Sequence, residues 1–373
     1  MIKVLHVINS LSAGGAERLV SEIVPLMNEE GFKVDILLLG QAQGIFIDEL
    51  KSKGINVISF NAKLYSFSNV VKLSKYYKNY DIVHSHLFPS LYWVALAKLA
   101  RPFANRKVKL IATEHNNKNR RFGKPHFRPI DKFIYSQFSE LIAISHKVYH
   151  VLSSWIERKD VNIIYNGVNL SRINSAHKTV LPQHKKNILM VASFTKQKDQ
   201  ATLIRAVQRL DESYHLYFAG DGPTKNDNIK LSKELGLEDR VHFLGIRNDV
   251  PSLMKTVDLN ILSSNFEGLS CVVLESMAAG VPFLGADVEG INDLISNPKG
   301  LFARGNDFEL SEKIKSILND STIGSVITEE NLAEVKKYDI HNMVDDYLAL
   351  YESCMGVKSN RKKKTEEKVG DFV

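Results

Sequence analysis

Short apolar runs alternate with helical stretches along the first half of the chain. Apolar residues at helical spacing mark Ala16–Glu29 and Leu91–Lys98, which lie between such runs. Buried strands separated by helices favour a parallel sheet that is covered on both faces. The expected strands are Val4–Ile8, Val34–Leu39, Val57–Phe60, Ile82–His84, Leu110–Thr113, Leu141–Ile144 and Val161–Ile164.

The second half repeats this plan after a polar interruption at 175–186. We therefore predict an α/β protein with two doubly wound, Rossmann-like parallel-sheet domains, 1–177 and 187–338, joined by a linker at 178–186. The loops at the carboxyl ends of their strands are expected to face a central cleft, which is the natural ligand site. The second set of strands is Ile188–Ala192, His215–Ala219, Val241–Leu244, Leu259–Leu262 and Pro282–Gly285.

Composition and length agree with a globular chain of two ordinary domains. The 373 residues are 44% hydrophobic and 24% charged, and no apolar run reaches the ~18–20 residues of a membrane span. Met1–Asn9 has no small-residue cleavage site, so we interpret it as a first strand and not as a signal peptide. Cys271 and Cys354 do not suggest a disulfide framework, which fits the cytoplasm.

Positive charge is concentrated in the first half. Residues 1–180 carry 25 basic and 13 acidic side chains, whereas the remainder carries 24 and 29. The segment Lys118–Arg128 mixes basic residues with Phe, which suits an anionic membrane surface or a phosphorylated acceptor. A solvated loop is the alternative, and no nucleic-acid-binding module is visible.

Two glutamates, Glu267 and Glu275, flank the start of an expected helix. Ser270 suits the N-cap, Cys271–Ala279 is helical in pattern, and Gly280 marks the stop. At 1.5 Å rise per residue the carboxylates lie roughly 10 Å apart, too far for the ~5–5.5 Å of a retaining glycosidase. This spacing suits two ends of a long ligand with a diphosphate at the helix N-terminus between them, as in a nucleotide sugar. Two solvated glutamates are the alternative.

The residues that follow strengthen the nucleotide-sugar interpretation. Gly280-Val281-Pro282 comes directly after the helix, and Glu289–Ile295 follows a short strand. A Glu, seven residues, a second Glu and a Gly-x-Pro turn resemble the retaining glycosyltransferases of the GT4 family, which have the GT-B architecture. The resemblance covers nearly the whole chain. It implies that the last helix, 339–356, crosses back to the first domain, and we expect the basic tail 357–373 to be disordered.

The same resemblance assigns residues to the donor. Gly14 and Gly15, at the start of a helix, would face the donor phosphates and the acceptor. Lys198 would be the cation for the leaving diphosphate. Ser193 stands where the family usually has Arg, and Lys196 is a candidate to compensate. The turn at Gly220 and the segment 245–250 would lie near the nucleotide.

Three histidines follow or end expected strands. His84 and His86 end one strand and His115 follows another, where α/β sheets present functional residues. A metal site that includes Glu114 is an open alternative, but no helical His-x-x-x-His supports it. The resemblance implies instead that His115 lies beside the reacting sugar and that His86 lies near the donor or acceptor. Structural imidazoles are the alternative for both.

We therefore predict a retaining glycosyltransferase without metal or cofactor. It would move a hexose-type sugar from a nucleoside diphosphate sugar, with UDP favoured, to a hydroxyl of a glycan or lipid-linked acceptor in polysaccharide or lipopolysaccharide synthesis. The expected location is the cytoplasm, on the inner face of the cytoplasmic membrane. A GT-B nucleotide-sugar epimerase and a non-catalytic sugar-nucleotide-binding protein are the alternatives. The predicted residues are His115, Glu267 and Lys198 for catalysis; Gly14, Gly15, Ser193, Lys198, Gly220, Gly268, Leu269, Ser270 and Glu275 for the donor; and His86, Arg120, Arg121 and Lys124 for the acceptor or membrane.

Overall fold

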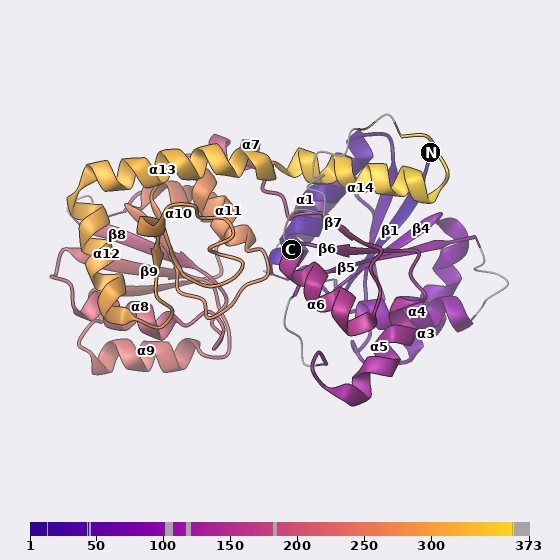
Figure 1. Cartoon of the computed structure of the whole chain (residues 1–373), viewed down its shortest axis with the longest axis horizontal. Coiled ribbons are helices and arrows are strands. Elements are labelled where there is room, and N and C mark those ends of the chain that lie inside the picture. The colour runs from indigo at the N-terminus through magenta and orange to yellow at the C-terminus, as the bar shows by residue number, and fades with distance from the viewer. Residues whose placement is uncertain are drawn as a thin grey trace. The chain divides into compact units, whose positions relative to one another are not determined.

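The computed structural model of the chain divides into two compact units (Figure 1). Unit 1 comprises residues 1–167 and 340–373, and unit 2 comprises residues 168–339. The structure describes all residues except 13, 43, 45, 101–106, 117–120, 182–184, 360 and 362–373.

Unit 1 is built on a seven-stranded parallel sheet of order β3-β2-β1-β4-β5-β6-β7. The sequence of β4 is buried throughout, and β1, β2 and β5 are buried after their first residue. Continuous burial of this kind arises because helices cover both faces of the sheet. The strands are β1 Lys3–Ile8, β2 Lys33–Leu38, β3 Val57–Ser59, β4 Ile82–His86, β5 Lys109–Glu114, β6 Glu140–Ala143 and β7 Val161–Ile163; the helices are α1 Gly15–Glu29, α2 Ile47–Ser52, α3 Ser68–Tyr76, α4 Ser90–Ala100, α5 Arg128–Tyr135, α6 His146–Ile156 and α14 Ile340–Cys354.

Unit 2 repeats the plan with a six-stranded parallel sheet of order β10-β9-β8-β11-β12-β13. The prediction of two doubly wound parallel sheets is therefore confirmed. Its strands are β8 Lys186–Val191, β9 Tyr214–Ala219, β10 Val241–Gly245, β11 Leu259–Leu262, β12 Phe283–Ala286 and β13 Leu301–Phe302; its helices are α7 Leu170–Ser175, α8 Gln200–Gln208, α9 Lys225–Glu234, α10 Val250–Thr256, α11 Cys271–Ala278, α12 Asp307–Asn319 and α13 Ser321–Val335.

The division between the units differs from the expected linker at 178–186. It falls between Gly167 and Val168, because α7 packs against α10 and α11 within unit 2. At the other end, Asp339 pairs with Val168 in an isolated parallel bridge, which closes unit 2 where the chain enters and leaves it. Unit 2 is thus an insertion in the chain of unit 1.

The C-terminal helix α14 belongs to the core of unit 1. Ile340, Val344, Tyr347 and Tyr351 are buried in one apolar cluster with residues of β1, β2 and α1. Figure 1 shows α14 next to α1, in agreement with the contacts between them. Of the expected tail, 357–359 and Arg361 are described, and the Arg361 guanidinium pairs with Glu30 at 2.9 Å and Asp345 at 3.0 Å. The rest of the tail lies outside the described residues.

Candidate active site

The loops that follow the strands of unit 2 meet at one edge of its sheet, because all of these strands are parallel. From β8 the chain builds β9 and β10 on one side, and it then returns to build β11, β12 and β13 on the other. The connections therefore diverge between β8 and β11, and such a switch point is where open α/β sheets bind ligands. The loops 192–199 and 263–270 follow these two strands.

A cation and a carboxylate are paired at this switch point. The Lys198 ammonium donates a hydrogen bond of 2.5 Å to Glu267 Oε1, and the two side chains are only 17% and 8% exposed. The loops that carry them are tied together, since the Gln197 amide donates to the Phe266 carbonyl at 2.8 Å and the Asn265 N–H donates to the Gln197 carbonyl at 2.7 Å. Lys198 and Glu267, each predicted separately as a catalytic residue, are thus held next to each other.

Helix α11 begins immediately after this pair. Its N-cap is Ser270, as the sequence predicts, but the Ser270 side chain makes no capping bond, and its carbonyl accepts from Val273 N–H at 3.1 Å. The first N–H groups of a helix have no intrahelical partner and favour an anion. Glu275 lies further along the same helix, is buried, and pairs through Oε1 with Arg172 Nη1 of α7 at 3.4 Å.

Two glycines allow the neighbouring loops to approach this edge closely. Gly290 has a left-handed φ of +82°, and a Cβ there would lie 2.2 Å from the carbonyl oxygen of Gly268. The adjacent Glu289 carbonyl accepts from the Glu267 N–H at 3.3 Å. Gly220 has a φ of +144°, and a Cβ there would lie 2.0 Å from the carbonyl oxygen of Ala192. Any side chain at either position would displace the site loops.

The position of the expected arginine is open to solvent. Ser193 is exposed after β8, and its carbonyl accepts a hydrogen bond from the Gln200 amide at 3.0 Å. Lys196 is also exposed in the same loop. Compensation by Lys196 for the missing arginine stays a prediction.

Unit 1 has its own switch point between β1 and β4. Gly14 and Gly15 follow β1 as the N-cap and first residue of α1, and His86 ends β4. His115 follows β5 on the same edge, because these strands are parallel. Ser145 is the N-cap of α6, and its Oγ accepts a hydrogen bond from Val148 N–H at 3.3 Å.

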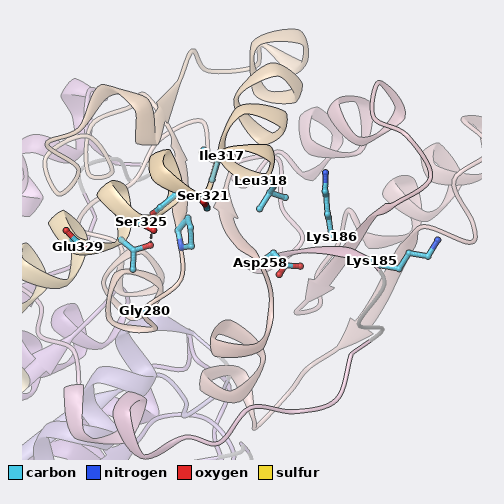
Figure 2. A pocket seen from close by; sticks show the side chains of 12 residues that line it. Lys185, Lys186, Asp258, Gly280, Ile317, Leu318, Ser321, Ser325 and Glu329 are labelled. Atoms are coloured by element: carbon cyan, nitrogen blue, oxygen red, sulfur yellow. Dashed lines mark hydrogen bonds between the residues drawn. The ribbon is translucent and has the colours of Figure 1, made fainter.

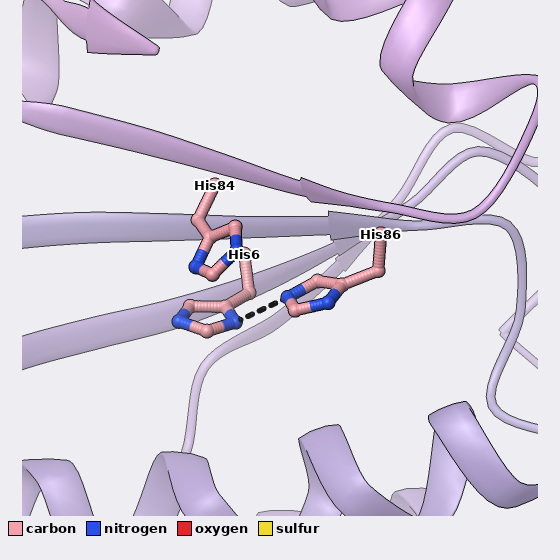
Figure 3. A group of neighbouring side chains, drawn as sticks. All are labelled: His6, His84 and His86. Atoms are coloured by element: carbon pink, nitrogen blue, oxygen red, sulfur yellow. Dashed lines mark hydrogen bonds between the residues drawn. The ribbon is translucent and has the colours of Figure 1, made fainter. Parts of the chain in front are cut away.

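His115 is joined to a group of buried histidines. Its Nε2 lies 3.1 Å from His86 Nδ1, and its side chain is 8% exposed. His86 Nε2 lies 2.9 Å from His6 Nδ1, and Figure 3 shows His6, His84 and His86 gathered on neighbouring strands. Burial lowers the pKa of His115 to about 4 and that of His6 to about 3. These imidazoles are therefore neutral at pH 7.

The three histidines in Figure 3 have the spacing of a loose metal cluster, with ligand atoms within 4.8 Å of one another. Their nitrogens, however, are engaged in hydrogen bonds: His84 Nδ1 lies 2.6 Å from Tyr351 Oη, and His84 Nε2 lies 2.8 Å from Thr113 Oγ1. Glu114, the carboxylate considered as a ligand, accepts instead from Tyr135 Oη at 2.7 Å. Hydrogen bonds account for the placement of these histidines. A metal ion among them would be a buried positive charge without a compensating negative charge.

The residues predicted to contact the acceptor or the membrane differ in burial and in their partners. His86 is wrong as a direct acceptor contact, because it is 1% exposed and both ring nitrogens are bonded to other histidines. Arg121 is wrong as a surface charge, because it is buried and forms an ion pair with the fully buried Asp131. Lys124 is exposed as expected, and Arg120 lies outside the described residues.

A separate hollow of about 500 Å³ lies in unit 2 (Figure 2). It opens among Lys186 and Asp258, at or next to the starts of β8 and β11, and residues of α12 and α13 such as Leu318 and Glu329. It is therefore at the amino-end edge of the sheet, opposite the switch-point loops. None of the predicted site residues lines it.

Sequence reasoning missed three residues that complete these arrangements. Arg172, paired with Glu275, has no distinctive local pattern, and its partner lies 103 residues away. Tyr351 contacts histidines of β1 and β4 from the last helix. His6 could have been noticed, because an imidazole in an otherwise apolar first strand needs a buried partner.

Comparisons with known proteins agree with this geometry. Residues 13–172 match the family model described as Glycosyltransferase Family 4, and residues 171–338 match the one described as Glycosyl transferases group 1. The chain is 27% identical over 362 residues, 91% of this chain and 97% of the relative, to the N-acetylgalactosamine-N,N'-diacetylbacillosaminyl-diphospho-undecaprenol 4-alpha-N-acetylgalactosaminyltransferase of Campylobacter jejuni.

A second relative and a solved structure are similar over nearly the whole chain. The UDP-Gal:alpha-D-GlcNAc-diphosphoundecaprenol alpha-1,3-galactosyltransferase of Escherichia coli is 24% identical over 379 residues, 91% of this chain and 95% of that protein. The crystal structure of Anabaena HepE in complex with UDP and glucose has a TM-score of 0.82 at 23% identity, covering 95% of this chain and 100% of that one. The two family models together run from residue 13 to residue 338, and the chain therefore belongs to the GT4-type glycosyltransferases of the GT-B fold.

Proposed function

We propose that this glycosyltransferase moves a hexose-type sugar from a nucleoside diphosphate sugar to an acceptor hydroxyl with retention of the anomeric configuration. The observation that carries the proposal is the Lys198–Glu267 pair, 2.5 Å apart, at the switch point of unit 2. In this assignment Lys198 and the first N–H groups of α11 bind the diphosphate, Glu267 binds sugar hydroxyls, and Glu275 binds the ribose hydroxyls.

The proposed chemistry is a front-face substitution without an enzymic nucleophile. The bond from the anomeric carbon to the β-phosphate oxygen breaks, and a bond to the acceptor oxygen forms on the same face. The hydroxyl proton passes to the departing phosphate oxygen, whose negative charge Lys198 stabilises. His115 would serve as a neutral hydrogen-bonding group beside the sugar, since burial lowers its pKa to about 4.

The donor and acceptor classes rest on the relatives. The Escherichia coli relative is named for a UDP-sugar donor, and the Anabaena structure holds UDP and glucose. The Escherichia coli and Campylobacter jejuni relatives are both named for diphosphoundecaprenol-linked acceptors. We infer a UDP-sugar donor and a lipid-linked acceptor for this chain too.

A lipid-linked acceptor requires access to a membrane surface, and α5 of unit 1 has features that support it. Ile130 and Phe133 are 48% and 54% exposed and lie three residues apart, on one side of the helix. Arg128 and Lys132 flank them and share Glu157 as their ion-pair partner. Among the described residues, no helix is long and apolar enough to cross a bilayer. We propose peripheral binding through this surface, the α5 patch (Lys124, Arg128, Ile130, Lys132 and Phe133).

A donor screen with bacterial lipid extracts as acceptors tests the proposed transfer. We expect one UDP-sugar to release UDP and to label the lipid fraction with its sugar. A glycosidase of known anomeric specificity then reports whether the new linkage keeps the donor configuration. Conversion of the sugar without UDP release would indicate the epimerase, and binding without either change would indicate a non-catalytic protein.

A further inference from the structure

A continuous chain of hydrogen bonds runs through the interior of unit 1 from His115 to α14. Apart from His115, which directly follows β5, its members come from β1, β4, β5 and α14 and are at most 1% exposed. The links, in order, are His115 Nε2 to His86 Nδ1 (3.1 Å), His86 Nε2 to His6 Nδ1 (2.9 Å), His6 Nε2 to Tyr351 Oη (3.2 Å), Tyr351 Oη to His84 Nδ1 (2.6 Å), His84 Nε2 to Thr113 Oγ1 (2.8 Å) and Thr113 Oγ1 to Tyr347 Oη (3.3 Å).

Every member of this chain is uncharged at pH 7. Burial lowers the pKa of His6 to about 3 and of His115 to about 4, and it holds the pKa of His84 and His86 well below the ordinary range. Burial also raises the pKa of both tyrosines. A neutral imidazole carries one N–H and one bare nitrogen, so each histidine donates once and accepts once.

A hydroxyl between two partners uses its single hydrogen only when it donates to one partner and accepts from the other. Every internal hydrogen therefore has an acceptor only when all the bonds point the same way. If they point from His115 toward α14, His115 donates from Nε2, and Thr113 donates to Tyr347. The Tyr347 hydrogen then has no acceptor, since among the described residues this hydroxyl bonds only to Thr113. A buried hydroxyl hydrogen without an acceptor costs its desolvation free energy.

If the bonds point from α14 toward His115, every hydrogen within the chain has an acceptor. Tyr347 donates to Thr113, and each following group donates to the next one along the chain. The last of these bonds runs from His86 Nδ1–H to His115 Nε2. His115 then carries its hydrogen on Nδ1, which forms no hydrogen bond with any side chain or backbone group of the described residues. This nitrogen is left to donate to a ligand.

We propose that this chain of hydrogen bonds, because it ends on hydroxyl groups, holds His115 in the tautomer protonated at Nδ1. Tyr351, whose hydroxyl joins His6 to His84, is thus a positioning residue for His115. The effect of the tautomer on sugar transfer rests on the function proposed above, because it requires His115 to contact the substrate. The tautomer itself does not depend on that function.

The test is nuclear magnetic resonance of the full chain labelled with ¹⁵N-histidine, without ligand. Two-bond ¹H–¹⁵N correlations distinguish protonated from bare ring nitrogens, and His115→Gln identifies the His115 signals. We expect a protonated Nδ1 and a bare Nε2 in the natural chain. In Tyr351→Phe the chain is cut between His6 and His84, so the hydroxyl groups at its far end no longer act on His115, and both nitrogens should shift toward averaged values.

A control on the same helix separates this effect from a loss of packing. Val344→Ala removes a buried side chain of α14 that is not in the chain of hydrogen bonds, so it should lower Tm and leave the His115 signals unchanged. Tyr347→Phe is a second control: the Thr113 hydroxyl then ends the chain and has the same preference, so the His115 signals should stay as in the natural chain. If Tyr351→Phe does not fold, Thr113→Val tests the same point, because the chain then ends on a ring nitrogen of His84. A natural chain protonated at His115 Nε2, or unchanged His115 signals in Tyr351→Phe, would overturn the proposal.

Activity provides the second measurement. We expect Tyr351→Phe to lower kcat and to leave KM for the donor unchanged. A shift in tautomer with unchanged kcat would support the hydrogen-bond proposal and count against the role of His115 in transfer.

Discussion

Glu267 and Glu275 have different cationic partners, Lys198 and Arg172, and the proposed function gives them different ligands. Glu275→Ala should weaken binding of bare UDP, because the ribose loses a hydrogen bond to a charged group. The expected loss is about 1.5–3 kcal/mol, or about 10- to 150-fold in Kd. Glu267→Ala should leave UDP affinity nearly unchanged and lower turnover.

Titration calorimetry with UDP on both variants measures this difference. Glu312→Ala on α12 is the control, since that carboxylate is about half exposed and lies outside the site loops. Equal and unchanged UDP affinity in the two site variants would contradict the ribose assignment.

Gly290 offers a second test at a single position. In Gly290→Ala the new methyl group would meet the Gly268 carbonyl at 2.2 Å, so the loop that carries Glu267 must move. Overpacking of this kind costs about 1–3 kcal/mol, and we expect a clear loss of kcat as well. Gly236→Ala is the matched control, because Gly236 has a φ of +68° with nothing near the new methyl group. It should lower Tm and spare activity; equal activity loss in both variants would contradict the argument.

At the scale of elements, Asp131 joins the helices beside it. The carboxylate of Asp131 on α5 accepts from Tyr92 of α4, from Arg121, and from Trp155 Nε1 of α6 at 2.7 Å. Arg121→Met should destabilise unit 1 by about 3–5 kcal/mol, because it leaves a buried carboxylate without its cation. Chemical denaturation measures the loss. Lys124→Met, three residues along and exposed, should change stability by less than about 0.5 kcal/mol.

The N-terminus of α11 underlies a prediction about metal ions. The proposed site meets the charge of the diphosphate with Lys198 and helix N–H groups, so it has no need of a divalent cation. Transfer should therefore continue in excess EDTA, measured as UDP release. Loss of activity that Mn²⁺ or Mg²⁺ specifically restores would contradict this mechanism.

The elements themselves were largely predictable from the sequence. The pattern of apolar runs predicted twelve strands, and each overlaps an observed strand. Of the strands within the described part of the chain, only the two-residue β13 was missed. The N-cap at Ser270 lies within a short motif, so local reasoning found it. Glu267 and Lys198 also lie within short motifs, and their roles in transfer stay predictions. The prediction for Arg121 was wrong, because it lies in a basic run that the sequence alone indicates to be solvated. In the fold, Asp131 and two aromatic rings surround its guanidinium.

Long-range partners were not predictable from one sequence. The bonds of Tyr351 to His6 and His84 join residues 345 and 267 positions apart. The residue at which unit 2 begins was also predicted wrongly, because it depends on long-range packing. The polar stretch at 175–186 looked like a linker, but packing of α7 against α11, far away in the chain, decides where the unit begins.

At the scale of the whole molecule, the α5 patch predicts how the protein meets a membrane. We expect sedimentation with anionic vesicles at low salt and weaker binding at high salt, since each nearby Lys or Arg contributes ~1 kcal/mol. Combined Lys124→Gln and Phe133→Ser should reduce this binding. Phe308→Ser, an equally exposed residue of unit 2, is the control. Equal binding to neutral and anionic vesicles, or none to either, would favour an acceptor in solution.

The insertion of unit 2 within unit 1 has a consequence for the order in which the protein can form during synthesis. Residues 168–339 are contiguous, so unit 2 can fold as soon as it leaves the ribosome. Unit 1 begins first and finishes last, because Ile340, Tyr347 and Tyr351 enter its core only with the final helix. Throughout that interval the buried histidines of β1 and β4 lack their tyrosine partners. A chain that stops before residue 340 should therefore contain a folded unit 2 and an aggregation-prone first half, which is a natural target for chaperones and proteases.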